Sequence, residues 1–349
     1  MVAPAPAAAA SVDDDAELAR PFRDCAEILA CPISGGRLVP SKRGFVAADG
    51  RTYAVRAGIP DLSAPVEAAP RDVTAAVKAF YEATPFPNYE TGDTRDTLLA
   101  KARRSYFLRA LDEQLPPDAV VLEAGCGTGQ LTNFLALDPR RRVFGGDLCR
   151  NSLRLAEDFR RRQGIDNAAF LQMNLFRPPF RPGSVDVLIS NGVLHHTADA
   201  RGGFEALLRV VKPGGLVLLG LYNRYARLPT LGRRWVFKRS GALHFLDRRL
   251  AGGRLDEAQR QAWFRDQYQH PHETRHSMDE VLRWFDDAGV AFLSSIPPAD
   301  GRAFTAAARL FDLQPRGSGV RRLAVQLGML ARGGADGGLF IMIGRKQGQ

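Results

Sequence analysis

A ten-residue segment, VLEAGCGTGQ at positions 121–130, directly follows an apolar run and carries three glycines at alternate positions. A glycine turn between a strand and a helix lets a nucleotide approach the backbone closely, because glycine has no Cβ. A dinucleotide fingerprint would need a glycine where Gln130 stands. Glu123 lies at the end of the strand, where its negative charge would repel a diphosphate. We therefore expect a cofactor that carries an ammonium group and no phosphate.

The chain from residue 119 onward alternates short apolar runs with amphipathic stretches. Near-continuous apolar strands separated by helices predict an α/β fold, in which helices cover both faces of a parallel sheet. The predicted strands are Ala119–Leu122, Val143–Gly146, Ala169–Met173, Val185–Ser190 and Leu216–Leu221. The predicted helices include Asn151–Gln163 and Gly203–Val211, preceded over 72–115 by a helical pattern that Pro85 and Pro87 interrupt.

The glycine segment resembles the first motif of the class I S-adenosylmethionine-dependent methyltransferase family, with a core similar to methyltransferase types 11 and 25. In that family an acidic residue and a GxGxG turn contact the methionine end of the cofactor. The resemblance implies S-adenosyl-L-methionine as the cofactor here. It also implies cofactor contacts from Glu123, Gly125, Cys126, Gly127, Thr128 and Gly129.

Further positions agree with this family in order and spacing. Asp147 ends the second strand, where the resemblance implies that a carboxylate accepts hydrogen bonds from both ribose hydroxyls. Asn174 ends the third strand, where the family usually has an Asp that accepts from the adenine amino group, and Asn keeps an oxygen acceptor there. Other expected neighbours of the cofactor are Leu148, Met173, Leu175 and Asn191.

The resemblance implies a Rossmann-like, doubly wound, seven-stranded, mostly parallel sheet with an antiparallel last strand, within residues 72–349. The final elements are expected to be a helix over SMDEVLRWFDDAG with a capping box from Ser277 to Glu280, a strand over VAFLSSI and the last strand over GGLFIMIGRK. Two extra segments, about 224–276 and 297–337, emerge at the carboxyl ends of strands, where ligands bind in such sheets. We expect them to form a helical cap over the substrate.

An N-terminal β-rich module, residues 21–65, resembles the small zinc-ribbon family of tRNA-methyltransferase activators. That family binds zinc tetrahedrally through four ligands. The matching positions here are Cys31, Ser34, Val46 and Asp49, so three of the four thiolates are missing and no zinc is expected. We expect the module to pack on the larger domain and to fold on an apolar core of Ile28, Leu38, Phe45, Tyr53, Val55 and Ile59.

Two histidines follow the fourth strand, near the place that the resemblance gives to the transferred methyl group. Methyl transfer from a sulfonium is an in-line displacement, so alignment of the nucleophile can supply most of the acceleration. A general base is needed only for an acceptor that must lose a proton. His196, and after it His195, are the candidate bases, with anchoring of the loop as the alternative role.

Candidate acceptor-binding residues lie in and before the lid-like PFPNYE segment, at the end of the fifth strand and in the HPHETRH run. They are Tyr81, Phe86, Tyr89, Tyr222, Asn223, Arg224 and His272, each with ordinary packing, turn formation or helix capping as the alternative. A metal site is not expected in HPHETRH, because a proline and a helix start separate its side chains: His270, His272, Glu273 and His276.

The composition of the chain says little about its partners and its cellular compartment. The net charge of +10 is spread as arginine over nearly every predicted helix, which favours a solvated basic surface over a dedicated anionic partner. Four scattered cysteines argue against a disulfide framework and favour the cytoplasm. No apolar run approaches the ~20 residues of a membrane span. The Ala/Pro-rich start, which runs into acids, predicts a disordered tail over 1–20 rather than a secretory signal.

The sequence favours methyl transfer to oxygen or carbon of a small molecule, similar to the ubiquinone/menaquinone-type branch of the family. The first alternative is methylation of RNA or of a translation protein, suggested by the ribbon-like module and by six basic residues of the cap: Arg233, Arg234, Lys238, Arg239, Arg248 and Arg249. Against it, SNGV after the fourth strand lacks the Asn/Asp-Pro-Pro-aromatic pattern of amino-directed nucleic-acid methyltransferases. The second alternative is a cofactor-binding partner protein without catalysis.

Overall fold

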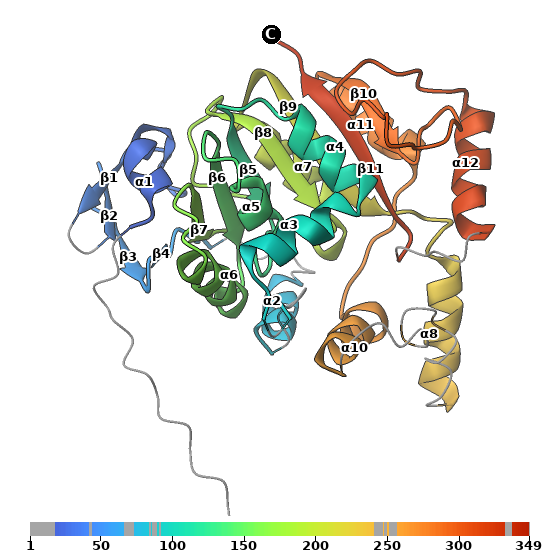
Figure 1. Cartoon of the computed structure of the whole chain (residues 1–349), viewed down its shortest axis with the longest axis horizontal. Coiled ribbons are helices and arrows are strands. Elements are labelled where there is room, and N and C mark those ends of the chain that lie inside the picture. Colours follow the sequence, from blue (N-terminus) through green and yellow to red (C-terminus); the bar gives the residue numbers. More distant parts are fainter. Residues whose placement is uncertain are drawn as a thin grey trace, which may run out of the picture.

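The main sheet of the molecule contains seven strands in the order β10-β11-β9-β8-β5-β6-β7 (Figure 1). In this computed structural model the described residues are 18–41, 44–65, 73–83, 85, 89–90, 92–240, 247, 250, 257–331 and 337–348. The strands from β5 to β9 pair in parallel, whereas β11 pairs antiparallel with both β9 and β10. The predicted Rossmann-like sheet with an antiparallel last strand is therefore confirmed.

All five predicted apolar runs form strands of this sheet. They are β5 (Val120–Ala124), β6 (Arg142–Asp147), β7 (Ala168–Gln172), β8 (Val185–Asn191) and β9 (Val211–Tyr222). The runs are apolar at nearly every position because both faces of the sheet are buried. The last two strands, β10 (Val290–Ile296) and β11 (Leu339–Lys346), also lie where the sequence predicts them.

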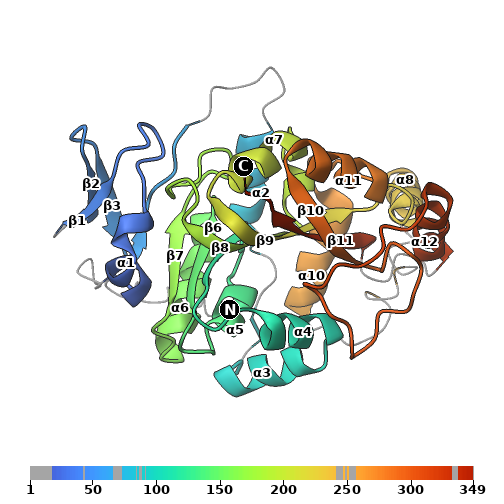
Figure 2. The same ribbon diagram turned by 90° about the horizontal axis from the view of Figure 1, so that it is seen from above.

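Helices cover both faces of the sheet (Figure 2). On one face, α4 (Tyr106–Gln114), α5 (Gln130–Leu135) and α6 (Arg150–Arg162) contribute Leu111, Phe134 and Phe159 to one hydrophobic core. On the other face, α7 (Ala200–Leu208) and α11 (Met278–Asp287) contribute Phe204 and Phe285 to a second core. The start of α11 is fixed by the predicted capping box between Ser277 and Glu280.

Helix α2 (Thr74–Ala83) is attached to the start of α6, next to the carboxyl ends of the parallel strands. The Glu82 carboxylate accepts hydrogen bonds from the backbone N–H groups of Arg150 (2.9 Å) and Asn151 (3.2 Å). These are first-turn donors that have no partner inside α6, and a carboxylate also interacts favourably with the positive end of the helix dipole. Helix α3 (Arg95–Arg103) then leads into α4.

The N-terminal module contains α1 (Arg20–Asp24), η1 (Ala26–Ile28) and a four-stranded antiparallel sheet of β1 (Leu38–Ser41), β2 (Gly44–Ala47), β3 (Thr52–Arg56) and β4 (Ile59–Pro60). Five of its six predicted core residues share one hydrophobic cluster, with Leu38, Phe45 and Tyr53 buried and Ile28 and Val55 partly buried against it, whereas Ile59 is buried in the other cluster, beside α3 to α6. Phe22 joins the module to the main sheet, with its ring 5.8 Å from the rings of both Phe45 and Phe144. The Cys31 thiol lies 2.9 Å from the Tyr53 hydroxyl.

Two insertions follow β9 and β10. The first contains α8 (Leu228–Ser240), α10 (Glu257–Phe264) and the π-helical turn η4 (Arg265–Gln269), and the second contains α12 (Gly319–Ala331). Helices α8 and α12 both lie at the end of the molecule farthest from the N-terminal module, with α12 above α8 in Figure 1 (Figures 1 and 2). No helix among the residues described here has the length and apolar character needed to cross a membrane. Residues 1–17 of the predicted tail, Phe86, Arg248 and Arg249 lie outside the described residues.

Candidate functional site

A cavity of about 610 Å³ lies at the carboxyl ends of the parallel strands. This volume is within the range of ~300–1,000 Å³ that is usual for small-molecule sites. The cavity is lined by residues of α2, of the glycine turn after β5, of the ends of β6, β8 and β9, and of η4 in the first insertion. It therefore lies where open α/β sheets bind ligands, with part of the first insertion as an additional wall.

The glycine turn forms one wall of the cavity. Gly125 has a φ of +84°, and a Cβ added to it would lie 2.4 Å from the Val193 side chain. Gly127 also has positive φ (+53°) and lines the cavity. Gly129 has a packing role instead, since a Cβ there would lie 2.6 Å from both Ala156 and Phe170. Two of the three glycines thus shape the cavity, and the third lets α5 approach its neighbours.

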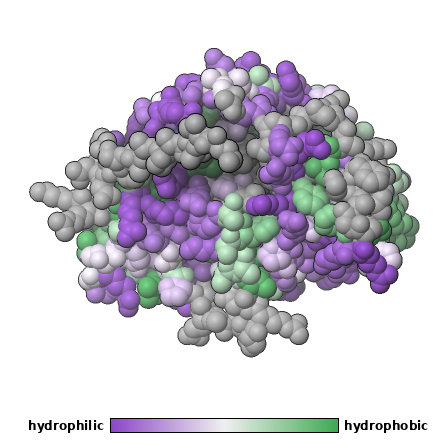
Figure 3. Space-filling view, turned by 90° about the horizontal axis from the view of Figure 1, so that it is seen from below, coloured by the Kyte–Doolittle hydropathy of each residue, from purple (hydrophilic) through white to green (hydrophobic). Residues whose placement is uncertain are grey.

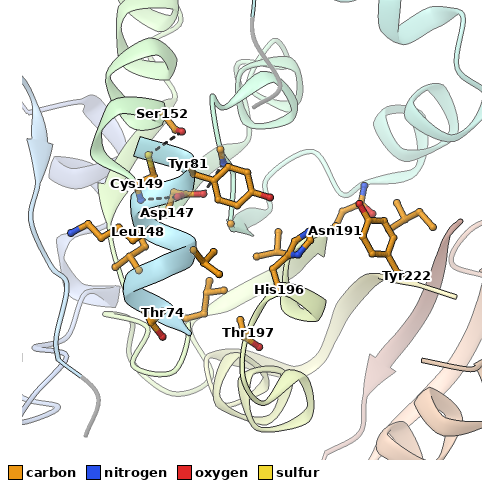
Figure 4. A pocket seen from close by; sticks show the side chains of 18 of the residues that line it. Thr74, Tyr81, Asp147, Leu148, Cys149, Ser152, Asn191, His196, Thr197 and Tyr222 are labelled. Carbon is orange, nitrogen blue, oxygen red and sulfur yellow. Dashed lines mark hydrogen bonds between the residues drawn. The ribbon is translucent and has the colours of Figure 1, made fainter. Parts of the chain in front are cut away.

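Asp147 lies at one end of the cavity, beside Leu148, Cys149 and Ser152 (Figure 4). One carboxylate oxygen accepts the N–H of Gly127 and the other accepts the N–H of Cys149, both at 2.8 Å. Burial raises the pKa of Asp147 above its ordinary value, although these backbone donors act in the opposite direction. Each oxygen keeps acceptor capacity beyond its one backbone bond, as recognition of two hydroxyls requires.

Two asparagines with different roles also line the cavity. Asn174 is largely occupied by the protein, since its side-chain oxygen accepts the N–H of Phe176 (3.0 Å) and its amide donates to the carbonyl of Ala64 (3.3 Å). The side-chain oxygen of Asn191 is buried against Gly220, where an added Cβ would clash with it, and it has no hydrogen-bond partner among the described residues. Asn191 therefore lines the cavity with other parts of the residue than this oxygen.

Histidine rings gather at the opposite end of the cavity. His196 lines the cavity, its ring centroid is 3.7 Å from that of His270, and its Nδ1 lies 3.0 Å from the carbonyl oxygen of His272. Burial lowers the pKa of His270 to about 2, with the nearby His196 as a second cause. His195 is fully buried behind them, where burial lowers its pKa far below the ordinary value, and its Nδ1 accepts the N–H of Tyr222 (3.3 Å). Only His196 is placed to reach a ligand.

A buried ion-pair network supports this end of the cavity. The Arg227 side chain is fully buried and donates through two nitrogens to the Glu273 carboxylate, which also pairs with Arg234 at 2.9 Å. Burial acts to raise the pKa of Glu273, but the hydrogen bonds and charge of Arg227 outweigh it and hold the pKa below its ordinary value. Arg227 also bonds to Gln267, whose amide donates to the Tyr222 hydroxyl at 3.0 Å. The network thus fixes two cavity-lining side chains, Gln267 and Tyr222.

The comparisons with known proteins agree with this geometry. Residues 122–219, which hold the glycine turn, Asp147, Asn191 and His196, match a family described as a methyltransferase domain. The chain contains a class I S-adenosylmethionine-dependent methyltransferase domain. The cofactor of this methyltransferase domain is therefore S-adenosylmethionine.

Three relatives show how far the similarity to the methyltransferase domain extends. An uncharacterized protein of a Synechococcus strain is 30% identical over 256 residues, which cover 65% of this chain and 61% of that protein. The tRNA (carboxymethyluridine(34)-5-O)-methyltransferase of Arabidopsis thaliana is 32% identical over 35% of this chain and 29% of its own length. The demethylmenaquinone methyltransferase of Lactococcus lactis is 32% identical over 36% of this chain and 48% of its own length. The chain thus spans less than two thirds of each relative.

The residues present in the methyltransferase domain fit this cofactor. Asp147 offers carboxylate oxygens as acceptors, and Gly125, Gly127 and Asn191 line the same cavity. Among the described residues that line the cavity, Lys78 is the one Lys or Arg side chain, so a diphosphate would lack the cationic partners that it usually finds in proteins. The lining members of the predicted cofactor set are Gly125, Gly127, Asp147, Leu148, Asn174, Leu175 and Asn191.

The other predicted cofactor residues do not line the cavity. The buried Glu123 carboxylate accepts a hydrogen bond from the Thr132 hydroxyl, and burial raises its pKa to about 8. Met173 is buried beneath Gly146, where an added Cβ would lie 2.5 Å from its sulfur. Cys126 and Thr128 are buried within the turn, and the position of Gly129 is set by packing. The motif residues at the strand ends therefore identify the fold, but only some of them line the cavity.

Of the predicted acceptor-binding residues, likewise, some line the cavity and others do not. Tyr81 and Tyr222 line the cavity, with Tyr81 reaching it from α2 (Figure 4). Tyr89 stacks on the buried Phe159, with ring centroids 4.2 Å apart, and does not line the cavity. Asn223 is fully buried and caps the following turn by accepting the N–H groups of Tyr225 and Ala226. Two more predicted residues do not line it: the exposed Arg224, which pairs with Glu280, and His272, which contributes its carbonyl.

Several lining residues were not predicted from the sequence. Trp263 and Gln267 reach the cavity from the first insertion, and Phe107 reaches it from α4. The π-helical turn at Gln267 is of a kind that occurs often at functional sites, but no sequence signal predicts it here. The remaining unpredicted lining residues are Thr74, Val77, Lys78, Ser105, Cys149, Ser152, Phe176, Gly192, Val193, Thr197, Ile296, Leu339 and Ile341. Among the described residues, no group of three or more His, Cys, Asp or Glu side chains is arranged to hold a metal ion.

Proposed function

We propose that this protein transfers the methyl group of S-adenosylmethionine to oxygen or carbon of a small, largely apolar acceptor. The proposal rests on one observation: the part of the cavity beyond the cofactor residues is walled mainly by apolar side chains. These are Phe107, Trp263, Ile296, Leu339 and Ile341. Such walls favour burial of an apolar molecule, whereas an extended polyanion would need several cations where the described lining has only Lys78.

Residues at one end of the cavity would bind the cofactor, and residues at the other end would bind the acceptor. Asp147 would accept hydrogen bonds from the cofactor and Asn191 lines the same cavity, so both would help to orient it, and the glycine turn would let it approach the backbone. S-adenosylmethionine, when bound, would supply an activated methyl group on its sulfonium sulfur. Tyr81, His196 and Tyr222, which line the same cavity, would hold the acceptor's oxygen or carbon beside that methyl group. The proton that the acceptor releases passes to Nε2 of His196.

A labelling screen tests the proposed acceptor class. The full-length protein is incubated with a cell extract and S-adenosylmethionine labelled on its methyl group, and the products are separated into organic-soluble, nucleic-acid and protein fractions. We expect the label in an organic-soluble small molecule, to be identified by mass spectrometry. Label that enters only RNA or protein would contradict the small-molecule assignment, and no label above that of the Asp147→Ala variant would contradict catalysis.

Methylation of RNA is the second candidate, because one relative is a tRNA methyltransferase and because the first insertion carries basic residues on α8. Direct phosphate contacts release counterions, so RNA binding would weaken steeply as salt rises. Filter binding of labelled tRNA at low and physiological salt distinguishes the two candidates. Absence of tRNA binding even at low salt would eliminate this alternative.

The N-terminal module and the location of the protein complete the proposal. We infer that the module is a structural unit docked on the methyltransferase domain, because Phe22 and the pairing of Leu62 with Gln172 (2.9 Å) join it to the main sheet. We infer a cytoplasmic location because all four cysteines are unpaired thiols. A cell fractionation that recovered the protein outside the cytoplasm with oxidised cysteines would contradict this inference.

A further inference from the structure

Helix α12 is apolar on two opposite faces. One face, with Val325 and Met329, packs against the hydrophobic core, and Gln326 is buried there at 1% exposure. The other face exposes Val320 (80%), Leu323 (41%) and Leu327 (44%). The spacing of these three residues places them on one side of a helix. Helix α12 therefore presents an apolar stripe to the surroundings in addition to the stripe that it buries.

Helix α8 adds to this surface. It lies below α12 along the same edge of the molecule (Figure 1) and exposes Leu228 (48%) and Trp235 (57%), which are two helical turns apart on one side of the helix. In Figure 3, hydrophobic atoms reach the right-hand margin of the molecule, the margin that carries α8 and α12 in Figure 1. We call the two exposed apolar stripes at this edge, Leu228 and Trp235 of α8 with Val320, Leu323 and Leu327 of α12, the end surface. Exposed apolar side chains that gather at one edge mark interaction sites more often than scattered single residues do.

The charge around the end surface has one sign. Helices α8 and α12 contain six Lys or Arg residues and no Asp or Glu. Two of the six are paired, Arg234 with Glu273 and Arg322 with Asp279. Lys238, Arg239 and Arg321 form no ion pair with any described residue, and Arg239 lies 4.1 Å from the Trp235 ring centroid. A cation held over an exposed aromatic ring is an arrangement suited to the boundary between lipid headgroups and acyl chains.

We propose that α8 and α12 dock this protein on an anionic lipid bilayer, with the end surface at the acyl-chain boundary and the three unpaired cations at the lipid phosphates. Apolar and basic residues on neighbouring faces are the combination that binds membrane interfaces. RNA would use the cations but would gain nothing from the aliphatic side chains of α12. A second copy of the chain would bring the same cations face to face in a symmetric interface.

Helix α8, which carries part of the end surface, also contacts the part of the first insertion that lines the cavity. Arg234 of α8 donates to the backbone carbonyl of Gln267, which lines the cavity, and Phe237 packs edge-on against Phe264 at 5.2 Å. An acceptor that is dissolved in the bilayer would thus meet the same insertion that walls the apolar part of the cavity. This connection rests on the proposed function, whereas the docking itself does not.

Co-sedimentation with vesicles tests the docking. The full-length protein is mixed with vesicles of phosphatidylcholine alone or of phosphatidylcholine with phosphatidylglycerol, at low and high salt. We expect binding to the anionic vesicles that weakens as salt screens the headgroup charge. The double variant Lys238→Gln/Arg239→Gln should bind about 30-fold more weakly, from ~1 kcal/mol per basic residue. The variant Val320→Ser/Leu327→Ser should lose at least about tenfold.

A matched control distinguishes the effect of the cations on α8 from the effect of the overall net charge. Arg103→Gln/Arg104→Gln removes two adjacent exposed cations at the end of α3, with the same change in net charge, and should leave vesicle binding nearly unchanged. Equal losses in both charge variants, equal binding to neutral vesicles, or no binding to anionic vesicles would overturn the proposal. A dimer in sedimentation velocity that the Val320→Ser/Leu327→Ser variant dissociates would assign the end surface to a second copy instead.

Failure of the docking and failure of the proposed function give different results. Calorimetric titration with S-adenosylmethionine in vesicle-free buffer measures the cofactor site alone, and the two double variants of α8 and α12 are expected to leave it unchanged. Vesicle binding without cofactor binding would contradict the function and preserve the docking. Cofactor binding and labelled products without vesicle binding would contradict only the docking.

Discussion

The Nδ1 atom of His196 lies 3.0 Å from the carbonyl oxygen of His272. A carbonyl can only accept, so Nδ1 carries the proton and the lone pair of the neutral ring is on Nε2. The carbonyl belongs to the residue before Glu273, which Arg227 and Arg234 hold in place. The protonation pattern of the candidate base is therefore set by a segment of the first insertion, nearly eighty residues away in the chain.

Replacement of His196 by Gln removes the candidate base and keeps a polar side chain of similar length. If His196 accepts the acceptor's proton, kcat should fall by about 10²–10⁴-fold. The dissociation constant for S-adenosylmethionine should stay within about threefold of the wild-type value, since Asp147 and Asn191 are untouched. Single-turnover kinetics with the acceptor found by labelling measures this. Unaltered turnover would leave His196 only the role of anchoring its loop.

Replacement of Asp147 by Ala should weaken cofactor binding. A hydrogen bond to a charged group contributes about 1.5–3 kcal/mol, which corresponds to roughly 10–150-fold in the dissociation constant. The change also frees the N–H groups of Gly127 and Cys149, so the glycine turn loses a support. Isothermal titration calorimetry measures the affinity, and Asp158→Ala on the exposed side of α6 is the matched control. Equal affinities for the two variants would refute the ribose assignment.

The buried Glu123 predicts a pH dependence of stability in the cofactor-free protein. Burial raises its pKa from 4.5 to about 8, so the folded state binds this proton more tightly than the unfolded state. Its contribution is complete below pH ~4.5 and is lost as the pH rises towards 8, by an amount on the order of 4 kcal/mol. Glu123→Gln cannot ionise and should flatten this part of the profile. Urea unfolding at several pH values gives the difference, and parallel profiles would show that Glu123 ionises normally.

Replacement of Gly125 by Ala should damage the cavity wall for two reasons. The residue has a φ of +84°, and its Cβ would lie 2.4 Å from Val193. Gly164→Ala is the matched control, because Gly164 has a φ of +62° and no atom within 4 Å of an added Cβ. We expect both variants to lose about 1–2 kcal/mol of stability from the backbone and only Gly125→Ala to lose cofactor affinity as well. Equal affinities in calorimetry would show that the turn does not shape the cofactor site.

Replacement of Arg227 by Met leaves the buried Glu273 with a single cationic partner. Removing one member of a buried ion pair typically costs about 3–5 kcal/mol, because the other charge stays buried. The double variant Arg227→Met/Glu273→Met removes both charges and should be more stable than the single variant. Urea unfolding at neutral pH compares the two. A double variant that is less stable than Arg227→Met would mean that the network stabilises the fold beyond charge compensation.

Much of the fold could be predicted because its signals are local. Five apolar runs became β5 to β9 since a strand buried on both faces is apolar at nearly every residue. The capping box from Ser277 to Glu280 formed since it needs only residues one turn apart. The glycine turn, Asp147 and His196 lie around one cavity because parallel strands bring their carboxyl ends to the same edge.

The sequence motifs did not predict which side chains point into the cavity. Glu123 and Met173 occupy the predicted strand ends, yet their side chains turn into the core, and next to Met173 it is Asn174 that lines the cavity. Successive residues of an extended segment point to opposite sides, so a motif that locates the segment does not decide which member faces a ligand. The adjacent His195 and His196 differ in the same way, since His196 lines the cavity and His195 is fully buried.

The sequence by itself determined the class of sheet and the position of the cofactor turn, because each depends on residue type over a few neighbouring positions. Only the tertiary structure decided what walls the acceptor end: Phe107, Trp263, Gln267 and Ile341 come from three separate segments of the chain. The tertiary structure likewise brought His272 to His196 and placed α8 and α12 at the same edge of the molecule. Contacts between segments distant in the chain are chosen by packing of the whole molecule, and no short pattern of residues encodes them.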